Sequence, residues 1–154
     1  MTKILMVCLG NICRSPLAEG ILKSKVNSAN FFIDSAGTSN FHEGDLPDTR
    51  SIKIAKKYGI DITNQRSRPF KKNDFDVFDI IYVMDISNYQ NIINLARDEK
   101  DKQKVKLILA ENSSSKISEV PDPYYDNEHG FDQVFKMLDE VCEIISTKLK
   151  NDNK

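Results

Sequence analysis

The sequence predicts an α/β fold: a small doubly wound four-stranded parallel sheet with helices on both faces. Short apolar runs alternate with segments of helical periodicity, which is the pattern of repeated strand-helix units. The first run, residues 4–7, is apolar without alternation, as in a parallel strand buried on both faces. A reactive loop follows that run, at the end of the strand where such sheets bind ligands. The chain has 154 residues, 40% of them hydrophobic, and residues 1–154 are expected to form one domain.

The first half of the chain predicts two strands, each followed by a helix. Residues 4–7 lead into a helix with Ser15 as its N-cap and Pro16 as its first helical residue. Residues 31–33 are expected to form the second strand, and residues 48–58 the second helix. The reactive loop therefore opens at a helix N-terminus.

The second half continues the alternation. Residues 80–84 and 105–109 predict the third and fourth strands, with a helix over residues 87–96. The charged residues 97–104 are expected to be a solvated connection. Apolar residues at helical spacing then predict an amphipathic last helix: Phe131, Val134, Phe135, Leu138, Val141, Cys142, Ile145 and Leu149. Residues 151–154 beyond it are expected to fray.

The reactive loop reads V-C-L-G-N-I-C-R-S-P over residues 7–16. The backbone N–H groups after Cys8, the positive end of the following helix and the guanidinium of Arg14 are expected to converge on one point. Such a cradle attracts an anion and favours the thiolate form of Cys8. The planar fork of Arg14 matches two oxygens of a phosphoryl group. The pattern predicts a cysteine nucleophile that attacks phosphate.

Each loop residue also has a simpler interpretation. Cys8 alone at a strand end is typical of a small buried hydrophobe, and only the surrounding loop favours a nucleophile. Asn11 is expected to supply the left-handed backbone that a tight cradle needs, although Asn is also an ordinary loop residue. Cys13 is open to three interpretations: core packing, a redox partner that forms a disulfide with Cys8, or half of a metal site. Metal is the poorest of these because neither His42 nor His129 has zinc-like spacing to the thiols, so no metal and no cofactor is expected.

A general acid is needed as well, because even a tyrosyl oxygen is a leaving group whose conjugate acid has a pKa of about 10. The polar segment 110–130 has no helical period, and long loops of this kind in compact domains are often functional. It contains Asp122, followed by Pro123, Tyr124 and Tyr125. Most Asp-Pro pairs are turns, but here Asp122 is the candidate to protonate the leaving group and later to activate water.

Composition excludes several classes of partner. Lys and Arg number 22 and Asp and Glu 23, so the net charge of -1 gives no reason to expect binding to nucleic acid or to an anionic membrane. No apolar stretch approaches the roughly 20 residues of a membrane span. Three cysteines without disulfide spacing suit a reducing compartment, so a cytoplasmic location is expected, although export without a signal leaves no trace in a sequence.

The chain resembles the low-molecular-weight protein tyrosine phosphatases over nearly its whole length. Five motifs occur in the family's order: V-C-L-G-N-I-C-R-S-P at 7–16, D-S-A-G-T at 34–38, P-D-x-R at 47–50, M-D at 84–85 and D-P-Y-Y at 122–125. The resemblance implies that Cys8 is the nucleophile, Arg14 binds phosphate and Asp122 is the acid and base. It also implies a hydrogen bond from Ser15 to the Cys8 sulfur, and a phosphate-binding loop made of Leu9, Gly10, Asn11, Ile12, Cys13, Arg14 and Ser15.

The same resemblance implies a supporting network and a substrate pocket. Asn11 would be held by Ser15 and Ser35, with help from a histidine that this chain lacks; the corresponding segment reads T-N-Q-R at 63–66, so Asn64 or Gln65 is expected to substitute. Phe41 would form an aromatic wall opposite Tyr124, with Ile12 lining the pocket. Phosphotyrosine-containing proteins would be the substrates, and a tyrosine kinase acting on Tyr124 or Tyr125 would be a further partner.

Three other functions compete with tyrosine phosphatase activity. Arsenate reductases of this fold use further cysteines in the middle of the chain, and residues 14–141 contain none. Protein-arginine phosphatases carry Thr at the position of Ile12, and an apolar Ile suits a phenyl ring better than a guanidinium. A phosphate-binding or redox-sensing module without turnover has no use for an acid such as Asp122. The sequence therefore favours a phosphatase that acts on tyrosine.

Overall fold

Four parallel strands form the centre of the molecule, in the order β2-β1-β3-β4. The computed structural model describes residues 1–152. The strands are β1 (Thr2–Cys8), β2 (Phe31–Gly37), β3 (Ile80–Val83) and β4 (Val105–Leu107). Because Cys8 pairs with Gly37 and Val7 with Val83, the carboxyl ends of the three strands β2, β1 and β3 lie side by side. Cys8 is the last residue of a central strand, as the sequence predicts.

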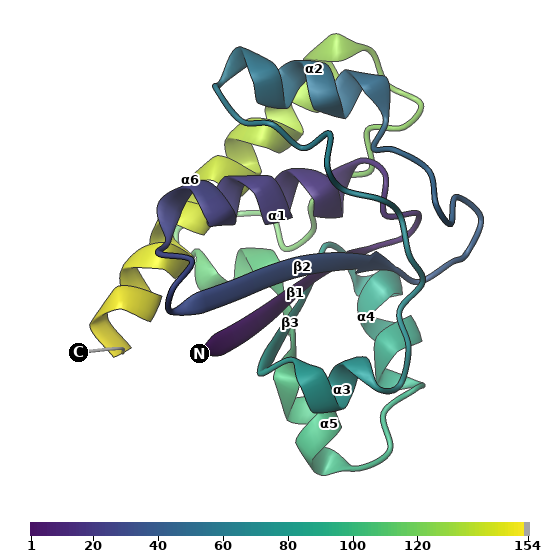
Figure 1. The fold of residues 1–154 in the computed structure, drawn as a ribbon, viewed down its shortest axis with the longest axis vertical. Helices are drawn as coiled ribbons and strands as arrows, with labels where there is room; N and C mark the ends of the chain where they lie inside the picture. Colours follow the sequence, from purple (N-terminus) through teal and green to yellow (C-terminus); the bar gives the residue numbers. More distant parts are fainter. Residues whose placement is uncertain (153–154) are drawn as a thin grey trace.

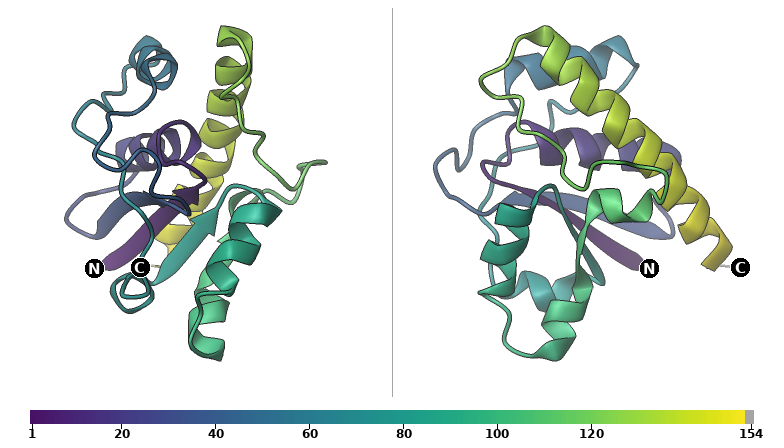
Figure 2. Two further views of the ribbon diagram at one scale, coloured as in Figure 1. Left: turned by 90° about the vertical axis from the view of Figure 1, so that its right-hand side faces the viewer. Right: turned by 180° about the vertical axis from the view of Figure 1, so that it is seen from behind.

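Helices cover both faces of the sheet (Figure 1). On one face lie α1 (Arg14–Lys25), α2 (Thr49–Lys57) and α6 (Glu128–Asp152), and on the other α3 (Asp74–Val77), α4 (Ile86–Ile93) and α5 (Glu99–Lys104). A short 3-10 helix, Ile108–Glu111, follows β4. The views in Figure 2 show the sheet between the two helical layers. The predicted doubly wound α/β fold is confirmed.

Alternate side chains of β1 enter two separate apolar cores. Ile4, Met6 and Cys8 belong to the core shared with α1 and α6. Leu5 and Val7 belong to the core on the other face, which includes residues of α3 and α4. Both sets are almost fully buried, which explains why the strand is apolar without a period of two.

Residues 99–104 of the charged segment 97–104 form helix α5, so the expected connection is a helix, although most of the segment is exposed as predicted. Asp98 caps α5 by accepting a hydrogen bond from the Asp101 N–H at 2.9 Å. Asp101 is in turn buried and pairs with Arg97, with 2.8 Å between Nε and Oδ2. The sequence does not predict these i,i+3 and i,i+4 contacts, because a run of residues with mixed charge is equally typical of a solvated loop.

Other boundaries differ by a few residues. Strand β4 ends at Leu107, two residues before the predicted end, because the chain turns there into the 3-10 helix. Helix α4 spans residues 86–93. The last helix continues through Asp152, so residues 151 and 152 are helical where fraying was expected, and residues 153–154 lie outside the described part. Among residues 1–152, no helix combines the length and apolar character that crossing a membrane requires.

Candidate active site

The reactive loop joins the end of β1 to the start of α1. The helix begins at Arg14, with Cys13 at the N-cap position and no side-chain cap. The prediction of Ser15 as N-cap and Pro16 as first helical residue was therefore wrong by two residues. Ser15 lies inside the first turn, where its hydroxyl is 3.0 Å from the sulfur of Cys8. The Ser15 hydroxyl does not cap the helix because it forms a hydrogen bond with the Cys8 sulfur instead.

Backbone carbonyls of the loop are engaged by the surrounding structure. Five accept hydrogen bonds at 2.8–3.3 Å: Cys8 from Thr38 N, Leu9 from Ser39 N, Gly10 from Ser67 Oγ, Ile12 from Asp48 N and Cys13 from Ser51 Oγ. In a trans peptide the next N–H points away from the carbonyl, and residues 1–152 contain no cis peptide. The loop N–H groups therefore face the opposite side, and that of Asn11 donates to the Cys8 sulfur at 3.3 Å. This arrangement is a nest for an anion.

Asn11 adopts the left-handed backbone that the sequence predicts, with φ of 57°. Its side-chain amide donates to Ser15 Oγ at 2.8 Å and to Ser35 Oγ at 3.0 Å. Its side-chain oxygen Oδ1 accepts a hydrogen bond from the Arg68 backbone N–H at 3.0 Å. Asn11 is only 2% exposed, so these bonds stabilise a conformation that is otherwise costly for a non-glycine residue.

Neither Asn64 nor Gln65 takes the place of the absent histidine, contrary to expectation. Gln65 Nε2 donates instead to the Pro16 carbonyl at 3.0 Å, on helix α1. The network around Asn11 is completed by the Arg68 N–H and by a buried acid that sequence reasoning missed, Glu19. Ser35 Oγ donates to Glu19 Oε1 at 2.6 Å, and Glu19 Oε2 pairs with Lys23.

Glu19 fixes the direction of the whole hydrogen-bond chain. Because Ser35 donates its hydroxyl hydrogen in the bond to the Glu19 carboxylate, the Ser35 oxygen can only accept a hydrogen bond from Asn11. The second N–H of the Asn11 amide then points at Ser15, whose own proton is left for the sulfur of Cys8. Burial raises the pKa of Glu19, an effect partly offset by its hydrogen bonds from Lys23 and Ser35.

Arg14 is held rigidly with one edge directed to the cavity. Its Nη1 donates to Asp85 Oδ2 at 2.7 Å and to the Val120 carbonyl at 2.9 Å, and its side chain is 2% exposed. Asp85 also caps α4, since its Oδ1 accepts from the Asn88 N–H at 2.8 Å. Burial alone would lower the pKa of Arg14, but the neighbouring Cys8 and the hydrogen bond to Asp85 raise it. Nη1 is fully used, so the Nε and Nη2 edge remains to meet two oxygens of a ligand.

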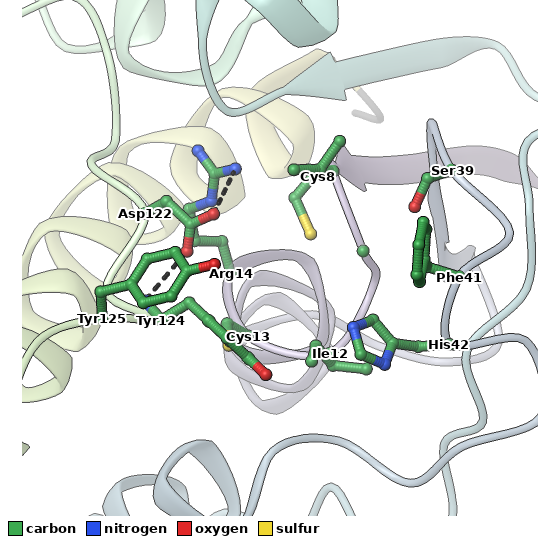
Figure 3. A pocket seen from close by; sticks show the side chains of 12 residues that line it. Cys8, Ile12, Cys13, Arg14, Ser39, Phe41, His42, Asp122, Tyr124 and Tyr125 are labelled. Atoms are coloured by element: carbon green, nitrogen blue, oxygen red, sulfur yellow. Dashed lines mark hydrogen bonds and ion pairs between the residues drawn. The ribbon is translucent and has the colours of Figure 1, made fainter.

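Asp122 lies beside Arg14 although it comes from the other end of the chain. The carboxylate Oδ2 is 3.7 Å from Arg14 Nη2, and its other oxygen accepts from the Tyr124 N–H at 3.0 Å. Its side chain is 41% exposed and thus open to the cavity. In Figure 3, the Cys8 sulfur points into a space with Arg14 and Asp122 on one side and Phe41 and His42 on the other.

This space is a cavity of about 540 Å³, large enough for an aryl phosphate. It is lined by Cys8, Leu9, Gly10, Ile12, Cys13, Arg14, Ser39, Phe41, His42, Asp122, Tyr124 and Tyr125. Phe41 is 88% exposed, whereas the His42 ring lies 6.5 Å from the Tyr124 ring, centre to centre. His42, which its sequence context indicated only as a poor metal ligand, therefore shares the wall expected from Phe41. Its Nδ1 is 3.3 Å from Asp45 Oδ2.

Burial affects the other two thiols, Cys13 and Cys142. Burial, together with the negative charge of Asp48 and the nearby Cys8, raises the pKa of Cys13, so this side chain stays a thiol. Burial also raises the pKa of Cys142 to about 12. All three cysteines are free in the structure. Within residues 1–152, no group of three or more His, Cys, Asp or Glu side chains is arranged to hold a metal ion.

Comparison with known proteins identifies the family. The family model for low molecular weight phosphotyrosine protein phosphatase matches residues 3–154. The enzyme of that name from Schizosaccharomyces pombe is 40% identical, covering 90% of this chain and 92% of its own, and that from Gallus gallus is 37% identical, covering 94% of each. A crystal structure of a protein tyrosine phosphatase from Entamoeba histolytica matches with a TM-score of 0.93 and 39% identity over 100% of both chains. The chain belongs to the low molecular weight phosphotyrosine protein phosphatase family.

Proposed function

We propose that Cys8, Arg14 and Asp122 carry out the two-step hydrolysis of phosphotyrosine that is general in this family, through a cysteinyl-phosphate intermediate. The observation that carries the assignment is their convergence on one cavity, with the sulfur at the base of an anion nest and the carboxylate at 3.7 Å from the guanidinium. A site for phosphate, a nucleophile beneath it and an acid beside it are the three parts that the reaction needs.

In the first step, the Cys8 thiolate attacks phosphorus from the side opposite the tyrosyl oxygen. The loop N–H groups and the free edge of Arg14 stabilise the charge on the non-bridging oxygens. As the P–O bond breaks, Asp122 transfers its proton to the departing phenolate oxygen. The products are free tyrosine hydroxyl and a phosphoryl group bonded to sulfur.

In the second step, water replaces sulfur on phosphorus. The Asp122 carboxylate, now without its proton, accepts a proton from the attacking water. The S–P bond breaks, inorganic phosphate is released and Cys8 returns as a thiolate. Ser15 supports this departure because its hydroxyl, 3.0 Å from the sulfur, stabilises the charge that develops there.

The pocket accounts for a preference for tyrosine. Ile12 forms an apolar part of the lining, and Tyr124 faces His42 and Phe41 across the cavity. A phenyl ring between these side chains brings its phosphate to the loop, whereas a seryl phosphate is too short to span the same depth. Phosphotyrosine-containing proteins are the substrates.

Replacement of the nucleophile tests the assignment. Cys8→Ser should abolish hydrolysis of p-nitrophenyl phosphate, because a neutral hydroxyl in this loop has no base to activate it. Inorganic phosphate binding, measured by calorimetry, should persist and show that the loop is intact. Substantial turnover by the variant would refute the assignment of Cys8. Side-by-side hydrolysis of phosphotyrosine, phosphoserine and phosphoarginine peptides tests the substrate.

Redox control by Cys13 is part of the proposal. Peroxide oxidises the Cys8 sulfur to a sulfenic acid, and the Cys13 thiol displaces water from it to form a reversible disulfide. Cys8 and Cys13 belong to one short loop and line the same cavity, which supports this role. The test is to inactivate wild type and Cys13→Ser with peroxide, add reductant and compare the phosphatase activity that each recovers. Equal recovery would exclude the disulfide.

Two further features follow from surface and composition. Tyr125 is 95% exposed and Tyr124 38%, so both can be reached by a tyrosine kinase, and mass spectrometry after kinase treatment tests this. Three free thiols suit a cytoplasmic location, which fractionation of cells would establish. Neither nucleic acid nor a membrane is expected as a partner of a chain with a net charge of -1.

A further inference from the structure

Arg50, the last residue of the P-D-x-R motif, lies between three parts of the molecule and outside the lining of the catalytic cavity. It stands in the first turn of α2, near the loop that carries Asp122 and near the start of α6. The two-step reaction assigns it no part. Its contacts nevertheless connect the nucleophile loop with the acid loop.

On one side, Arg50 is tied to the nucleophile loop through Asp48. Nε and Nη2 of Arg50 each donate to one carboxylate oxygen of Asp48 at 3.0 Å, a bidentate pair. The backbone N–H of Asp48 donates to the Ile12 carbonyl at 2.8 Å. The hydrogen bonds that Arg50 donates to Asp48 raise the pKa of Arg50, so its charge is permanent. One end of this link is therefore fixed to the phosphate-binding loop.

On the other side, Arg50 holds the turn that follows Asp122. Its Nη1 donates to the carbonyl of Asp126 at 3.0 Å. The N–H of Asp126 closes a turn onto the carbonyl of Pro123 at 2.8 Å, and within that turn the Tyr124 N–H donates to Asp122. A movement of Asp126 would therefore pass directly to the acid.

Stacking completes the link. The Arg50 guanidinium carbon lies 4.5 Å from the ring centre of Phe131 and 5.6 Å from that of Tyr124. Phe131 is 1% exposed and belongs to the core beneath α1 and α6, so one stacking partner is immobile. The other partner, Tyr124, is a pocket residue of the acid loop.

We propose that Arg50 is a positioning residue that sets the distance between Asp122 and the nucleophile loop. The loop carrying the acid has no helix or strand between residues 112 and 127, so its geometry depends on such tethers. Both planar edges of the guanidinium are used, and Lys cannot reproduce the bidentate pair together with the bond to Asp126. This inference rests on the proposed role of Asp122 as the acid.

The leaving group distinguishes this role from a general structural one. A misplaced acid slows the expulsion of a poor leaving group, such as phenol, much more than that of p-nitrophenol, which needs little protonation. Damage to the phosphate-binding loop would instead slow both substrates equally and weaken inhibition by inorganic phosphate. The ratio of kcat/KM for p-nitrophenyl phosphate to that for phenyl phosphate therefore reports on the acid alone.

The experiment compares Arg50→Lys and Arg50→Ala with Lys53→Ala and Asp122→Ala. Lys53, also on α2, pairs with Glu128 at 2.6 Å on an exposed surface and makes no contact with the acid turn, so its variant is the matched control. In both Arg50 variants the kcat/KM ratio should rise about tenfold, with phosphate inhibition unchanged within about twofold. Lys53→Ala should leave both quantities as in wild type.

Each outcome has one meaning. An unchanged ratio in Arg50→Lys, with a raised ratio in Asp122→Ala, would overturn the role of Arg50 and leave the acid assignment standing. An unchanged ratio in Asp122→Ala would overturn the acid assignment itself. Equal loss for both substrates together with weaker phosphate inhibition would make Arg50 a structural residue of the nucleophile loop. Arg50→Lys keeps the charge and much of the side-chain volume, so the test does not depend on how well Arg50→Ala folds.

Discussion

A single buried carboxylate, Glu19, orders a chain of hydrogen bonds that ends at the reactive sulfur. Ser35, Asn11 and Ser15 lie between the two, and all are buried. Each member can donate in one direction only, because the proton of Ser35 is committed to Glu19. The sulfur of Cys8 is therefore met by the Ser15 hydroxyl, whose orientation is set by Glu19, one helix turn further along α1.

Replacement of Glu19 should change stability with a defined dependence on pH. The folded-state pKa of Glu19 is raised, chiefly by burial, so the unfolded chain loses this proton first as pH rises. Relative to a neutral side chain, Glu19 therefore costs nothing well below its ordinary pKa of 4.5 and progressively lowers stability as pH rises from there to its folded value. Glu19→Gln should accordingly gain melting temperature relative to wild type as pH rises above 4.5. A difference that stays constant over this range would contradict the raised pKa.

His42 should contribute more to substrate binding than the exposed Phe41. Its ring faces that of Tyr124 at 6.5 Å, and aromatic pairs contribute about 0.5–1.5 kcal/mol beyond area. We expect His42→Ala to raise KM for phosphotyrosine peptides roughly threefold to tenfold with little change in kcat. Phe41→Ala is the control, since Phe41 is 88% exposed. A larger rise in KM for Phe41→Ala than for His42→Ala would show that Phe41 is the main aromatic side chain of the pocket wall.

Chemistry made some residues predictable and left others hidden. Cys8 and Arg14 could be proposed from the chemistry of the loop, whereas Asp122, in an Asp-Pro pair that is typical of a turn, was a weak candidate until the family resemblance supported it. Glu19 could not be predicted, because an acid four residues before Lys23 has the spacing of an ordinary surface ion pair. Asp85 was visible only as part of the M-D motif, and its bond to Arg14 spans elements that are far apart in sequence.

At the scale of elements, the end of β2 supports the nucleophile loop by close approach. A Cβ atom at Gly37 would lie 2.8 Å from the Leu9 carbonyl oxygen and 3.2 Å from the Asn11 nitrogen. Both neighbours are backbone atoms, which cannot rotate away. The paired strand ends therefore define where the loop turns, and side-chain contacts only refine it.

Gly37→Ala should displace the loop and lower activity. We expect kcat/KM for p-nitrophenyl phosphate to fall by at least about tenfold, because small displacements of reacting groups are costly. Gly44→Ala is a suitable control, since Gly44 has a φ of 86° but a Cβ atom added there would meet no other atom within 4 Å; it should lose stability without comparable loss of turnover. Equal kinetic losses in the two variants would argue against the close-approach explanation.

Strands and long helices were predictable because apolar periodicity carries their position. The sequence could not reveal α3 or the start of α5, since both are short and rich in charge. Helix α3 depends on tertiary packing instead, because its Phe75 is buried in an apolar core. The start of α1 was misplaced because Ser15 has the chemistry of a cap but uses it on the sulfur of Cys8. The preference of Ser15 for the N-cap position was therefore outweighed by its hydrogen bond to Cys8 in the site.

For the whole molecule, ligand binding should couple to global stability. The anion site joins β1, α1 and, through Val120, the segment after β4, so an anion bound there stabilises only the folded chain. At 100 times its Kd, inorganic phosphate should add about 2.7 kcal/mol, or roughly 5–10 °C in melting temperature. Arg14→Lys should lose most of this gain. Chloride at equal ionic strength is the control, and an equal shift with chloride would contradict a specific site.

The catalytic cavity is assembled from segments near both ends of the described chain, and this has a consequence for biosynthesis. A ribosome adding roughly 5–20 residues each second makes Cys8, the proposed nucleophile, on the order of ten seconds before Asp122, the proposed acid, and before the Val120 carbonyl that anchors Arg14. Until then the nascent polypeptide carries a sulfhydryl with neither proton donor nor aromatic wall. A nascent chain that has not yet reached Asp122 therefore lacks the proposed acid, and we expect it to hydrolyse phosphate esters far more slowly than the folded protein.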